Sequence, residues 1–242
     1  MSTEERKTIY LCLAHMSEEG YEQKYVKEAF DTNWVVPMGP NVNAFEQNLA
    51  DFANANSDGS KLARKVVCLS AGTAAVHLAL IACGVKTGDE VCVQSFTFCA
   101  SSHPITYLGA KPVFIDSERE TWNMDPELLE KAIIERKAAI GKYPKAIIPV
   151  ALYGMPYDCE RIMAIADKYG IPVIEDAAEG LGSRFNGQVL GTFGRFGVLS
   201  FNGNKMITTS GGGALICRNE EDANNIMWHA TQARDAYSYY QH

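Results

Sequence analysis

The sequence has no long apolar run and no cluster of basic residues. A helix needs about 18 consecutive apolar residues to cross a bilayer, so we expect no membrane partner. The formal net charge of −7 disfavours nucleic acid as a partner. The opening residues, MSTEERKTIY, are charged and lack the apolar stretch of a signal peptide. We therefore predict a cytoplasmic protein.

The sequence also lacks any cysteine pair of the Cys-x-x-Cys type, and its seven cysteines are not clustered with other metal ligands. An odd count without a recurring spacing is typical of free thiols in a reducing compartment. Several of the cysteines stand inside apolar, strand-like runs, which favours burial. We predict free cysteines and no metal site. The cysteines are Cys12, Cys68, Cys83, Cys92, Cys99, Cys159 and Cys217.

From Lys65 onward, short apolar runs alternate with helix-like segments. Runs that are apolar on both faces are typical of buried parallel strands, and their alternation with helices predicts an α/β layer fold with right-handed crossovers. Asp125, followed by proline, and Asp158 mark two helix starts. The expected strands are 65–69, 90–94, 112–116, 146–150, 172–175, 197–201 and 214–217, and the expected helices are 73–83, 100–108, 125–140 and 158–169.

The first 60 residues show a different pattern, with helix-like segments at 18–30 and 42–53. We expect residues 1–60 to form an N-terminal arm with helices that pack on a domain of residues 61–242. Asn186-Gly187 predicts a tight hairpin turn. A last helix is expected from Glu220, after which the chain ends without a closing element, as in an interrupted domain.

The segment SAGTAA, residues 70–75, joins a predicted strand to a predicted helix. Small residues at such a turn leave backbone N–H groups free, and the positive end of the helix dipole favours an anion there. Gly72 permits a close approach, and Thr73 adds a hydroxyl. The turn is not a Walker A loop, because no Gly-Lys-Ser/Thr follows. It predicts a phosphate site, with a plain strand-to-helix turn as the alternative.

A carboxylate and a lysine follow two later strands. Asp176 can pair with a cationic ring nitrogen, a metal or a ribose, or it can cap the next helix. Lys205 has apolar flanks and precedes three glycines; a desolvated lysine can form a Schiff base, whereas most lysines are solvated. A phosphate cradle, an acid for a ring nitrogen and such a lysine are together the groups that hold pyridoxal phosphate.

These segments, in this order, resemble the DegT/DnrJ/EryC1/StrS family of pyridoxal-phosphate-dependent sugar aminotransferases, which have the aspartate aminotransferase-like fold type I. SFNGNK and EDAAEGLGS are most similar to the branch that aminates UDP-4-keto-6-deoxy-N-acetylhexosamines. The resemblance implies a large α/β domain, with a mostly parallel sheet and helices on both faces. The matching segments are NWVVPMGPNVNAFEQNLADF, SAGTAAVHLAL, SFTFCASSHPITYLGAKPVFID, EDAAEGLGS and SFNGNKMITTSGGGALI.

The resemblance also implies roles for single residues. Lys205 would be the catalytic Schiff-base lysine and proton shuttle. Asp176 would pair with the pyridine nitrogen of the cofactor, pyridoxal 5'-phosphate. Gly72 and Thr73 would offer backbone amides, and Ser200 a hydroxyl, to its phosphate.

Further roles follow from the same resemblance. Phe98 would stack on the cofactor ring. Glu179 stands where many members have glutamine, near the phenolic oxygen of the cofactor; a carboxylate beside a phenolate is repelled unless one of them is protonated. Trp34 belongs to a matching arm segment and would lie near the substrate. His103 and Tyr153 are substrate candidates because they stand near the ends of predicted strands.

The implied reaction transfers an amino group from an amino acid, glutamate, to the C4 keto group of a nucleotide-linked deoxy sugar, in the biosynthesis of surface glycan or lipopolysaccharide. Family members are expected to be homodimers and to continue into a smaller C-terminal domain beyond His242, so a non-catalytic fragment is one alternative. In related sugar dehydratases, histidine replaces the lysine at position 205. A dinucleotide-binding oxidoreductase would need a Gly-x-Gly-x-x-Gly turn, which SAGTAA does not supply.

Overall fold

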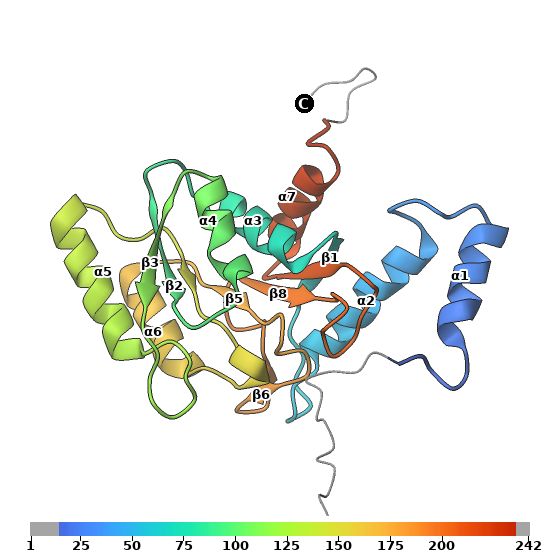
Figure 1. Cartoon of the computed structure of the whole chain (residues 1–242), viewed down its shortest axis with the longest axis horizontal. Helices are drawn as coiled ribbons and strands as arrows, with labels where there is room; N and C mark the ends of the chain where they lie inside the picture. Colours follow the sequence, from blue (N-terminus) through green and yellow to red (C-terminus); the bar gives the residue numbers. More distant parts are fainter. Residues whose placement is uncertain (1–14, 236–242) are drawn as a thin grey trace, which may run out of the picture.

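A central sheet organises the computed structural model, which describes residues 15–235 (Figure 1). A four-stranded part has the order β1-β9-β8-β5, and a three-stranded part has the order β3-β2-β4. Parallel bridges from Ile147 to Val173 and from Val150 to Asp176 join β4 to β5, so the seven strands run side by side. They are β1 (Lys65–Leu69), β2 (Glu90–Gln94), β3 (Lys111–Ile115), β4 (Ile147–Ile148), β5 (Ile174–Asp176), β8 (Phe196–Ser200) and β9 (Gly213–Cys217).

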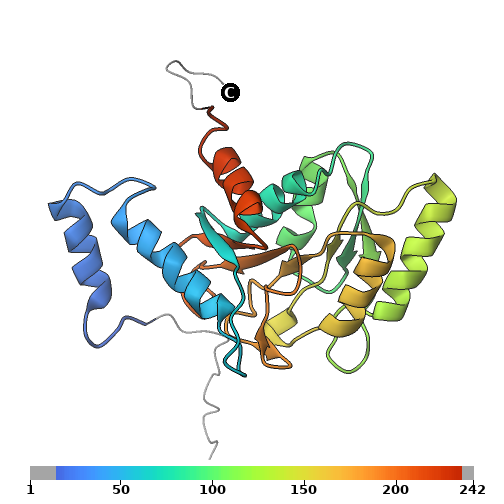
Figure 2. The ribbon, with the colours of Figure 1, turned by 180° about the vertical axis from the view of Figure 1, so that it is seen from behind.

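Helices cover both faces of this sheet (Figures 1 and 2). One layer contains α2, α5 and α6, and the other contains α3, α4 and α7. The helices are α1 (Tyr21–Asp31), α2 (Pro40–Asn54), α3 (Gly72–Ala82), α4 (His103–Tyr107), α5 (Pro126–Ile140), α6 (Cys159–Tyr169) and α7 (Glu220–Ala230), with short 3₁₀ turns η1 (Cys99–Ser101) and η2 (Leu152–Gly154).

Two hydrophobic cores result, one on each face of the sheet. Successive side chains of a strand point to opposite faces, so neighbouring residues enter different cores. Val66 packs with the α2, α5 and α6 layer, whereas Val67 packs with the α3, α4 and α7 layer. Ile147 and Ile148 divide in the same way. This burial on both faces explains the unbroken apolar strands of the sequence and confirms the predicted α/β class.

One strand departs from the parallel arrangement. β9 pairs antiparallel with both β1 and β8, whereas β5 pairs parallel with β8, and β2 with both β3 and β4. The connection from β8 to β9, residues 201–212, contains no helix. Parallel neighbours need a crossover connection, usually a helix, whereas antiparallel neighbours do not. The helix-free connection therefore accounts for the antiparallel direction of β9. The sheet is therefore mostly parallel, as predicted, with β9 as the exception.

The local signals for helix starts and turns are confirmed. The Asp125 carboxylate accepts hydrogen bonds from the backbone N–H groups of Glu127 and Leu128. The Asp158 carboxylate caps α6 by accepting a hydrogen bond from the backbone N–H of Arg161. Asn186 and Gly187 have φ values of 47° and 84°. They form the hairpin turn between the short strands β6 (Arg184–Phe185) and β7 (Gln188–Val189).

Several boundaries differ from those expected. The helix expected over 100–108 is divided into η1 and α4, with Pro104 in the first turn of α4, where a missing N–H is tolerated. The helix expected from residue 18 begins at Tyr21, after Gly20 in the left-handed region. The described cysteines are all free, and Cys12 lies outside the described residues. Within residues 15–235, no helix is long and apolar enough to cross a membrane.

Candidate functional site

A cavity of about 620 Å³ lies at the carboxyl ends of β1, β2, β4, β5 and β8. Ligands bind at this edge in open α/β sheets. β9 runs in the opposite direction, so Gly211 and Gly212, which precede it, line the same cavity. The structure brings together every predicted site residue except Trp34 and His103. Those that line the cavity are Gly72, Thr73, Phe98, Tyr153, Asp176, Glu179, Ser200 and Lys205.

The turn before α3 forms one wall of the cavity. α3 begins at Gly72, and no side chain of its N-cap residue, Ala71, occupies the first-turn N–H groups. A Cβ on Gly72 would lie 3.1 Å from the Ser200 Cβ, so the glycine allows the turn to approach the end of β8. A Cβ on Gly213 would lie only 2.4 Å from the Ala71 carbonyl carbon. Because Gly72 and Gly213 have no side chain, the first-turn N–H groups of α3 lie close to the Ser200 hydroxyl. This arrangement is suited to binding an anion.

Asp176 ends β5 between β4 and β8, with 6% of the residue exposed. Its Oδ2 accepts a hydrogen bond from the Ser101 hydroxyl at 2.5 Å, and its Oδ1 accepts one from the Ala178 N–H at 3.2 Å. Burial raises the pKa of the Asp176 carboxyl, while these hydrogen bonds and the charge of Lys205 act in the opposite direction. A bound cation would add to the groups that keep this carboxylate ionised.

Lys205 also lines the cavity, beside Glu179. The Lys205 Nζ is 3.4 Å from the Glu179 Oε1, and the side chains are 15% and 29% exposed. The Glu179 Oε2 accepts a hydrogen bond from the backbone N–H of Tyr153 at 2.8 Å. Tyr153 has φ 51° and ψ 26°, in the left-handed region, and its residue is 68% exposed. Glu179 therefore contacts the segments that follow β4 and β8.

Sequence reasoning missed Thr97 and Ser101, which support Asp176. Ser101 is fully buried, and its hydroxyl oxygen lies 2.7 Å from that of Thr97. Both residues follow β2, four positions apart, in the segment that also carries Phe98. Polar residues directly after a buried strand were the available signal. Asn202 and Asn204 also line the cavity, within the segment that contains Lys205.

Glu175, the neighbour of Asp176, was also missed. Its residue is 1% exposed, and its carboxylate accepts hydrogen bonds from the N–H groups of Gly191, Phe193 and Gly194 at 2.9, 2.6 and 2.7 Å. Burial raises the pKa of the Glu175 carboxyl, and the three N–H donors oppose the shift. Glu175 thus secures the turn that leads into β8.

Two predicted substrate residues lie apart from the cavity lining. Trp34 follows α1 and covers Gly39, where a Cβ would lie 2.6 Å from its ring. His103 begins α4 and is exposed. Their predicted contacts with substrate stay predictions.

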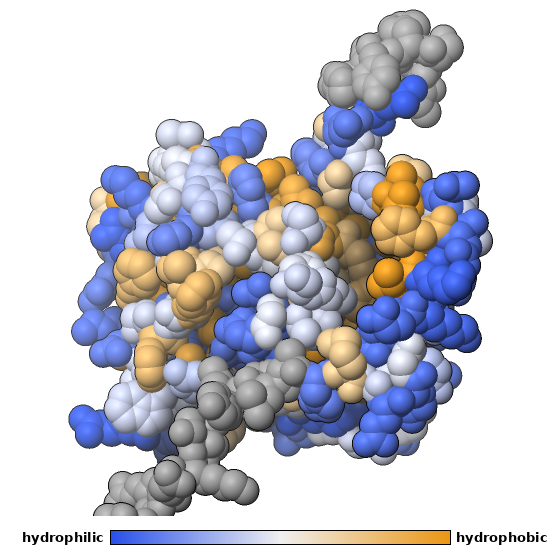
Figure 3. Space-filling view, turned by 45° about the vertical axis from the view of Figure 1, so that its right-hand side comes forward, coloured by the Kyte–Doolittle hydropathy of each residue, from blue (hydrophilic) through white to orange (hydrophobic). Residues whose placement is uncertain are grey.

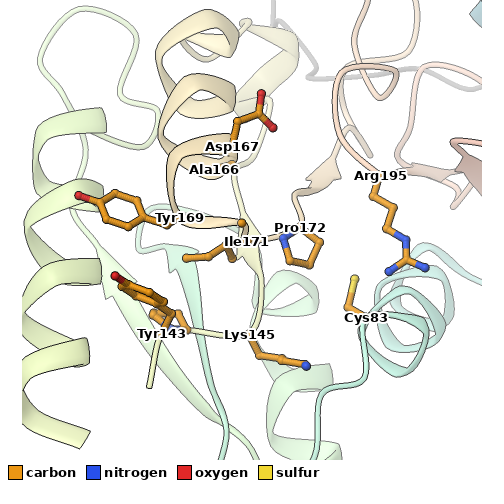
Figure 4. Close-up of a pocket in the computed structure, with 11 residues that line it drawn as sticks. Cys83, Tyr143, Lys145, Ala166, Asp167, Tyr169, Ile171, Pro172 and Arg195 are labelled. Atoms are coloured by element: carbon orange, nitrogen blue, oxygen red, sulfur yellow. The ribbon is translucent and has the colours of Figure 1, made fainter. Parts of the chain in front are cut away.

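A second cavity, of about 540 Å³, lies at the opposite edge of the sheet, where Lys145 and Arg195 precede β4 and β8 (Figure 4). Both side chains extend toward Cys83. The Arg195 guanidinium is already engaged by Asp222 at 2.6 Å. No residue predicted for chemistry lines this cavity. Throughout the described part of the chain, no three histidine, cysteine, aspartate or glutamate side chains form a group that could hold a metal ion.

Comparisons with known proteins agree with this geometry. Residues 16–241 match the DegT/DnrJ/EryC1/StrS aminotransferase family. The "Putative pyridoxal phosphate-dependent aminotransferase EpsN" of Bacillus subtilis (strain 168) is 52% identical over 236 residues, which cover 98% of this chain and 58% of that protein. The "UDP-2-acetamido-2-deoxy-3-oxo-D-glucuronate aminotransferase" of Pseudomonas aeruginosa is 40% identical over 201 residues, 82% of this chain and 51% of that protein.

Among solved structures, a DegT DnrJ EryC1 StrS aminotransferase from Brucella abortus has a TM-score of 0.79 and 30% identity, covering 93% of this chain and 61% of its own. The present chain therefore spans only part of the length of these relatives. The predicted family resemblance, fold type and pyridoxal phosphate cofactor are confirmed by these matches. The chain belongs to the DegT/DnrJ/EryC1/StrS aminotransferase family.

Proposed function

We propose that this chain is the cofactor-binding part of an aminotransferase that transfers an amino group to a keto group of a nucleotide-linked sugar. The observation that carries the proposal is the convergence of Lys205, Asp176 and the Gly72 turn on one cavity. These groups come from three separate segments of the chain, each at the same edge of the sheet. A lysine, an acid and an anion cradle in one cavity are the set that pyridoxal phosphate requires.

The residues of the cavity fit this cofactor. The N–H groups of Gly72 and Thr73, at the start of the 11-residue helix α3, would hold the phosphate together with the Ser200 hydroxyl. Asp176 would bind the protonated ring nitrogen, since a buried carboxylate gains most from an opposite charge. Phe98, which lines the cavity and is 73% exposed, would pack on the ring.

The chemistry depends on Lys205 as attachment point and proton carrier. When bound, pyridoxal phosphate supplies a carbonyl carbon that takes up the amino group and a ring that withdraws electrons from it. The Nζ of Lys205 would move a proton between the substrate carbon and the cofactor carbon that carries the amino group. Asp176, which lines the same cavity, would keep the ring nitrogen protonated throughout.

The Pseudomonas aeruginosa relative is named as an aminotransferase of a UDP-linked 3-oxo sugar, which supports a nucleotide-linked keto sugar as substrate. We propose the C4 keto group of a deoxy sugar as the acceptor and glutamate as the donor, as the motifs SFNGNK and EDAAEGLGS indicate. The product would enter surface-glycan or lipopolysaccharide biosynthesis. The 3-oxo sugar of this relative makes the C3 keto group the second candidate.

The first experiment adds pyridoxal phosphate to the chain, records the visible absorbance, reduces with borohydride and maps the labelled peptide. We expect the label on Lys205, and its loss in Lys205→Arg. Lys145→Arg, at the opposite edge of the sheet, is the matched control and should retain the label. Failure to label Lys205, both in this chain and in one extended to the length of its relatives, would contradict the proposal.

A second experiment addresses the acceptor and the donor. The extended chain, loaded with pyridoxal phosphate, is given glutamate and either a UDP-linked 4-keto-6-deoxy sugar or a UDP-linked 3-keto sugar. Mass spectrometry then detects the amino sugar. Amination of the 4-keto sugar alone supports the proposed position, and amination of the 3-keto sugar alone replaces it with the second candidate.

We also propose that the whole protein is a homodimer. Helix α1 has no buried residue, and it exposes Tyr25, Val26 and Phe30. The side of the molecule that carries α1 and α2 shows hydrophobic residues beside hydrophilic ones (Figure 3). In this proposal the N-terminal arm extends to about residue 60 and is anchored through α2, whose Leu49 and Ala53 enter the core. Light scattering should give a dimer, and Phe30→Glu should shift it toward monomer.

A further inference from the structure

Glu179 is the group that joins the cavity's lysine to a turn on another segment. Its two carboxylate oxygens have different partners, the Lys205 amine at 3.4 Å and the Tyr153 N–H at 2.8 Å. Glu179 itself belongs to the loop after β5. One carboxylate therefore connects three loops that line the cavity, those after β4, β5 and β8.

The ion pair has a chemical consequence for Lys205. Burial favours the neutral form of an amine, and the Lys205 side chain is only 15% exposed. A carboxylate beside the amine favours the charged form instead. Only the neutral amine has the lone pair that attacks a carbonyl carbon, so the charge of Glu179 opposes the reaction that attaches a carbonyl compound to this lysine.

The contact with Tyr153 has a different consequence, because it depends on an acceptor oxygen and not on charge. Tyr153 has a positive φ of 51°, a conformation that costs an L-residue about 1 kcal/mol or more without compensation. The hydrogen bond from its N–H to Glu179 provides part of that compensation. The exposed Tyr153 ring is thereby kept at the cavity wall.

We propose that Glu179 is a positioning residue with two separable effects: its charge restrains the Lys205 amine from attacking carbonyl compounds, and its second oxygen fixes the Tyr153 turn. The inference rests on the proposed role of Lys205 as the attachment point. Among the described residues, the other titratable groups that line the cavity are Asp176 and Tyr153. The carboxylate of Asp176 acts on Lys205 in the same sense as Glu179 and is unchanged in the variants below.

The test uses formaldehyde and borohydride, which label amines without any cofactor. The neutral amine attacks the aldehyde carbon, water leaves, and hydride from borohydride reduces the resulting carbon–nitrogen double bond. Peptide mapping then gives the labelling rate of Lys205 at about pH 7. Glu179→Gln removes the charge but retains an oxygen that can accept a hydrogen bond from the Tyr153 N–H. We expect Lys205 of this variant to be labelled about threefold faster than Lys205 of the unmodified chain.

The matched control is Glu127→Gln. The Glu127 carboxylate also lies 3.4 Å from a cationic nitrogen, that of Arg161, but on the surface of α5, and its replacement changes the net charge equally. Lys205 labelling should be unchanged there. Equal labelling rates of Lys205 in Glu179→Gln and in the unmodified chain would overturn the charge effect. Labelling of Lys205 by formaldehyde but not by pyridoxal phosphate would instead contradict the proposed function.

Hydrogen exchange at the Tyr153 amide tests the second effect. Glu179→Ala removes both the charge and the acceptor oxygen, so we expect faster exchange at Tyr153, by about tenfold. Glu179→Gln should retain most of the protection while still accelerating the labelling of Lys205. If the alanine and glutamine variants exchange at the same rate as the unmodified chain, the Tyr153 turn does not depend on Glu179.

Discussion

The Ser101 hydroxyl donates a hydrogen bond of 2.5 Å to the Asp176 carboxylate across 75 positions of sequence. Both residues are buried, Ser101 fully and Asp176 to all but 6%. The hydrogen bond stabilises the ionised form of a carboxyl whose pKa burial raises. In the proposed function, Ser101 therefore supports the acid that binds the ring nitrogen.

Replacement of Ser101 by alanine should weaken cofactor binding. Without the hydroxyl, the pKa of the Asp176 carboxyl rises further, and a hydrogen bond to a charged group contributes about 1.5–3 kcal/mol. We expect the dissociation constant of pyridoxal phosphate to increase about tenfold at neutral pH, and more as the pH falls. Spectrophotometric titration measures this. Ser102→Ala, which removes the neighbouring exposed hydroxyl, is the control and should leave the affinity unchanged.

Asp176→Asn should change how stability depends on pH. The pKa of the folded carboxyl is raised above its ordinary value of 3.8, so the folded state holds this proton more tightly than the unfolded state. The contribution of this carboxyl to the free energy of unfolding is therefore greatest below pH 3.8. That contribution is lost as the pH rises through the raised pKa of the folded state. Asparagine carries no charge and removes this loss.

Urea denaturation between pH 4 and 8 measures the effect. The free energy of unfolding of Asp176→Asn, relative to the unmodified chain, should increase with pH, while cofactor affinity falls. Glu175, whose pKa is also raised by burial, is present in both proteins and cancels in the difference. A difference that is constant over this range would mean that Asp176 is ionised alike in the folded and unfolded states.

Glu175→Ala should be strongly destabilising. The substitution leaves the N–H groups of Gly191, Phe193 and Gly194 without their acceptor, and each unsatisfied buried donor costs about 1–3 kcal/mol. We expect a loss of about 3 kcal/mol or more in the free energy of unfolding by urea. Glu175→Gln, which keeps one acceptor oxygen, should lose less. Equal losses would indicate that packing, and not the hydrogen bonds, secures the turn.

The three consecutive glycines before and within β9 should differ in their tolerance of alanine. A Cβ on Gly213 would lie 2.5 Å from the Gly72 nitrogen, so Gly213→Ala must displace the turn that begins α3. We expect weaker binding of pyridoxal phosphate and a lower melting temperature. A Cβ on Gly211 would meet nothing within 4 Å, so Gly211→Ala is the control for the melting temperature.

How far the sequence predicts this structure depends on whether the signal is local. The capping aspartate Asp125 and the Asn186-Gly187 turn act within a few residues, and both are confirmed. The apolar pattern of β9 does not give its direction, because the pattern is the same whether the neighbouring strand is parallel or antiparallel; the signal was the connection of residues 201–212, which contains no helix. Strand periodicity describes burial and does not describe pairing.

The residues of the candidate site also divide into those with a local sequence signal and those that depend on contacts between distant segments. The residues that the sequence suggested, such as Asp176 and Lys205, end or follow apolar strands and so have local signals. The Ser101 contact with Asp176 was not predictable because it depends on how β2 and β5 lie in the finished sheet. Glu175 and Asp176 are adjacent carboxylates, and neighbouring side chains of a strand point to opposite sides. Glu175 therefore binds the backbone of the turn at Gly191, whereas Asp176 lines the cavity.

The pairing of β1 with β9 determines when the site can form during folding. Lys65 lies opposite Cys217, and Leu69 lies opposite Gly213, so the turn that begins α3 rests on one of the last strands of the chain. Contacts of such long sequence separation form late, after the entropy of closing a long loop has been overcome. A ribosome must therefore have released the Gly213 strand before the proposed phosphate site at the Gly72 turn can form. Uptake of pyridoxal phosphate by a growing chain would report that the sheet is complete.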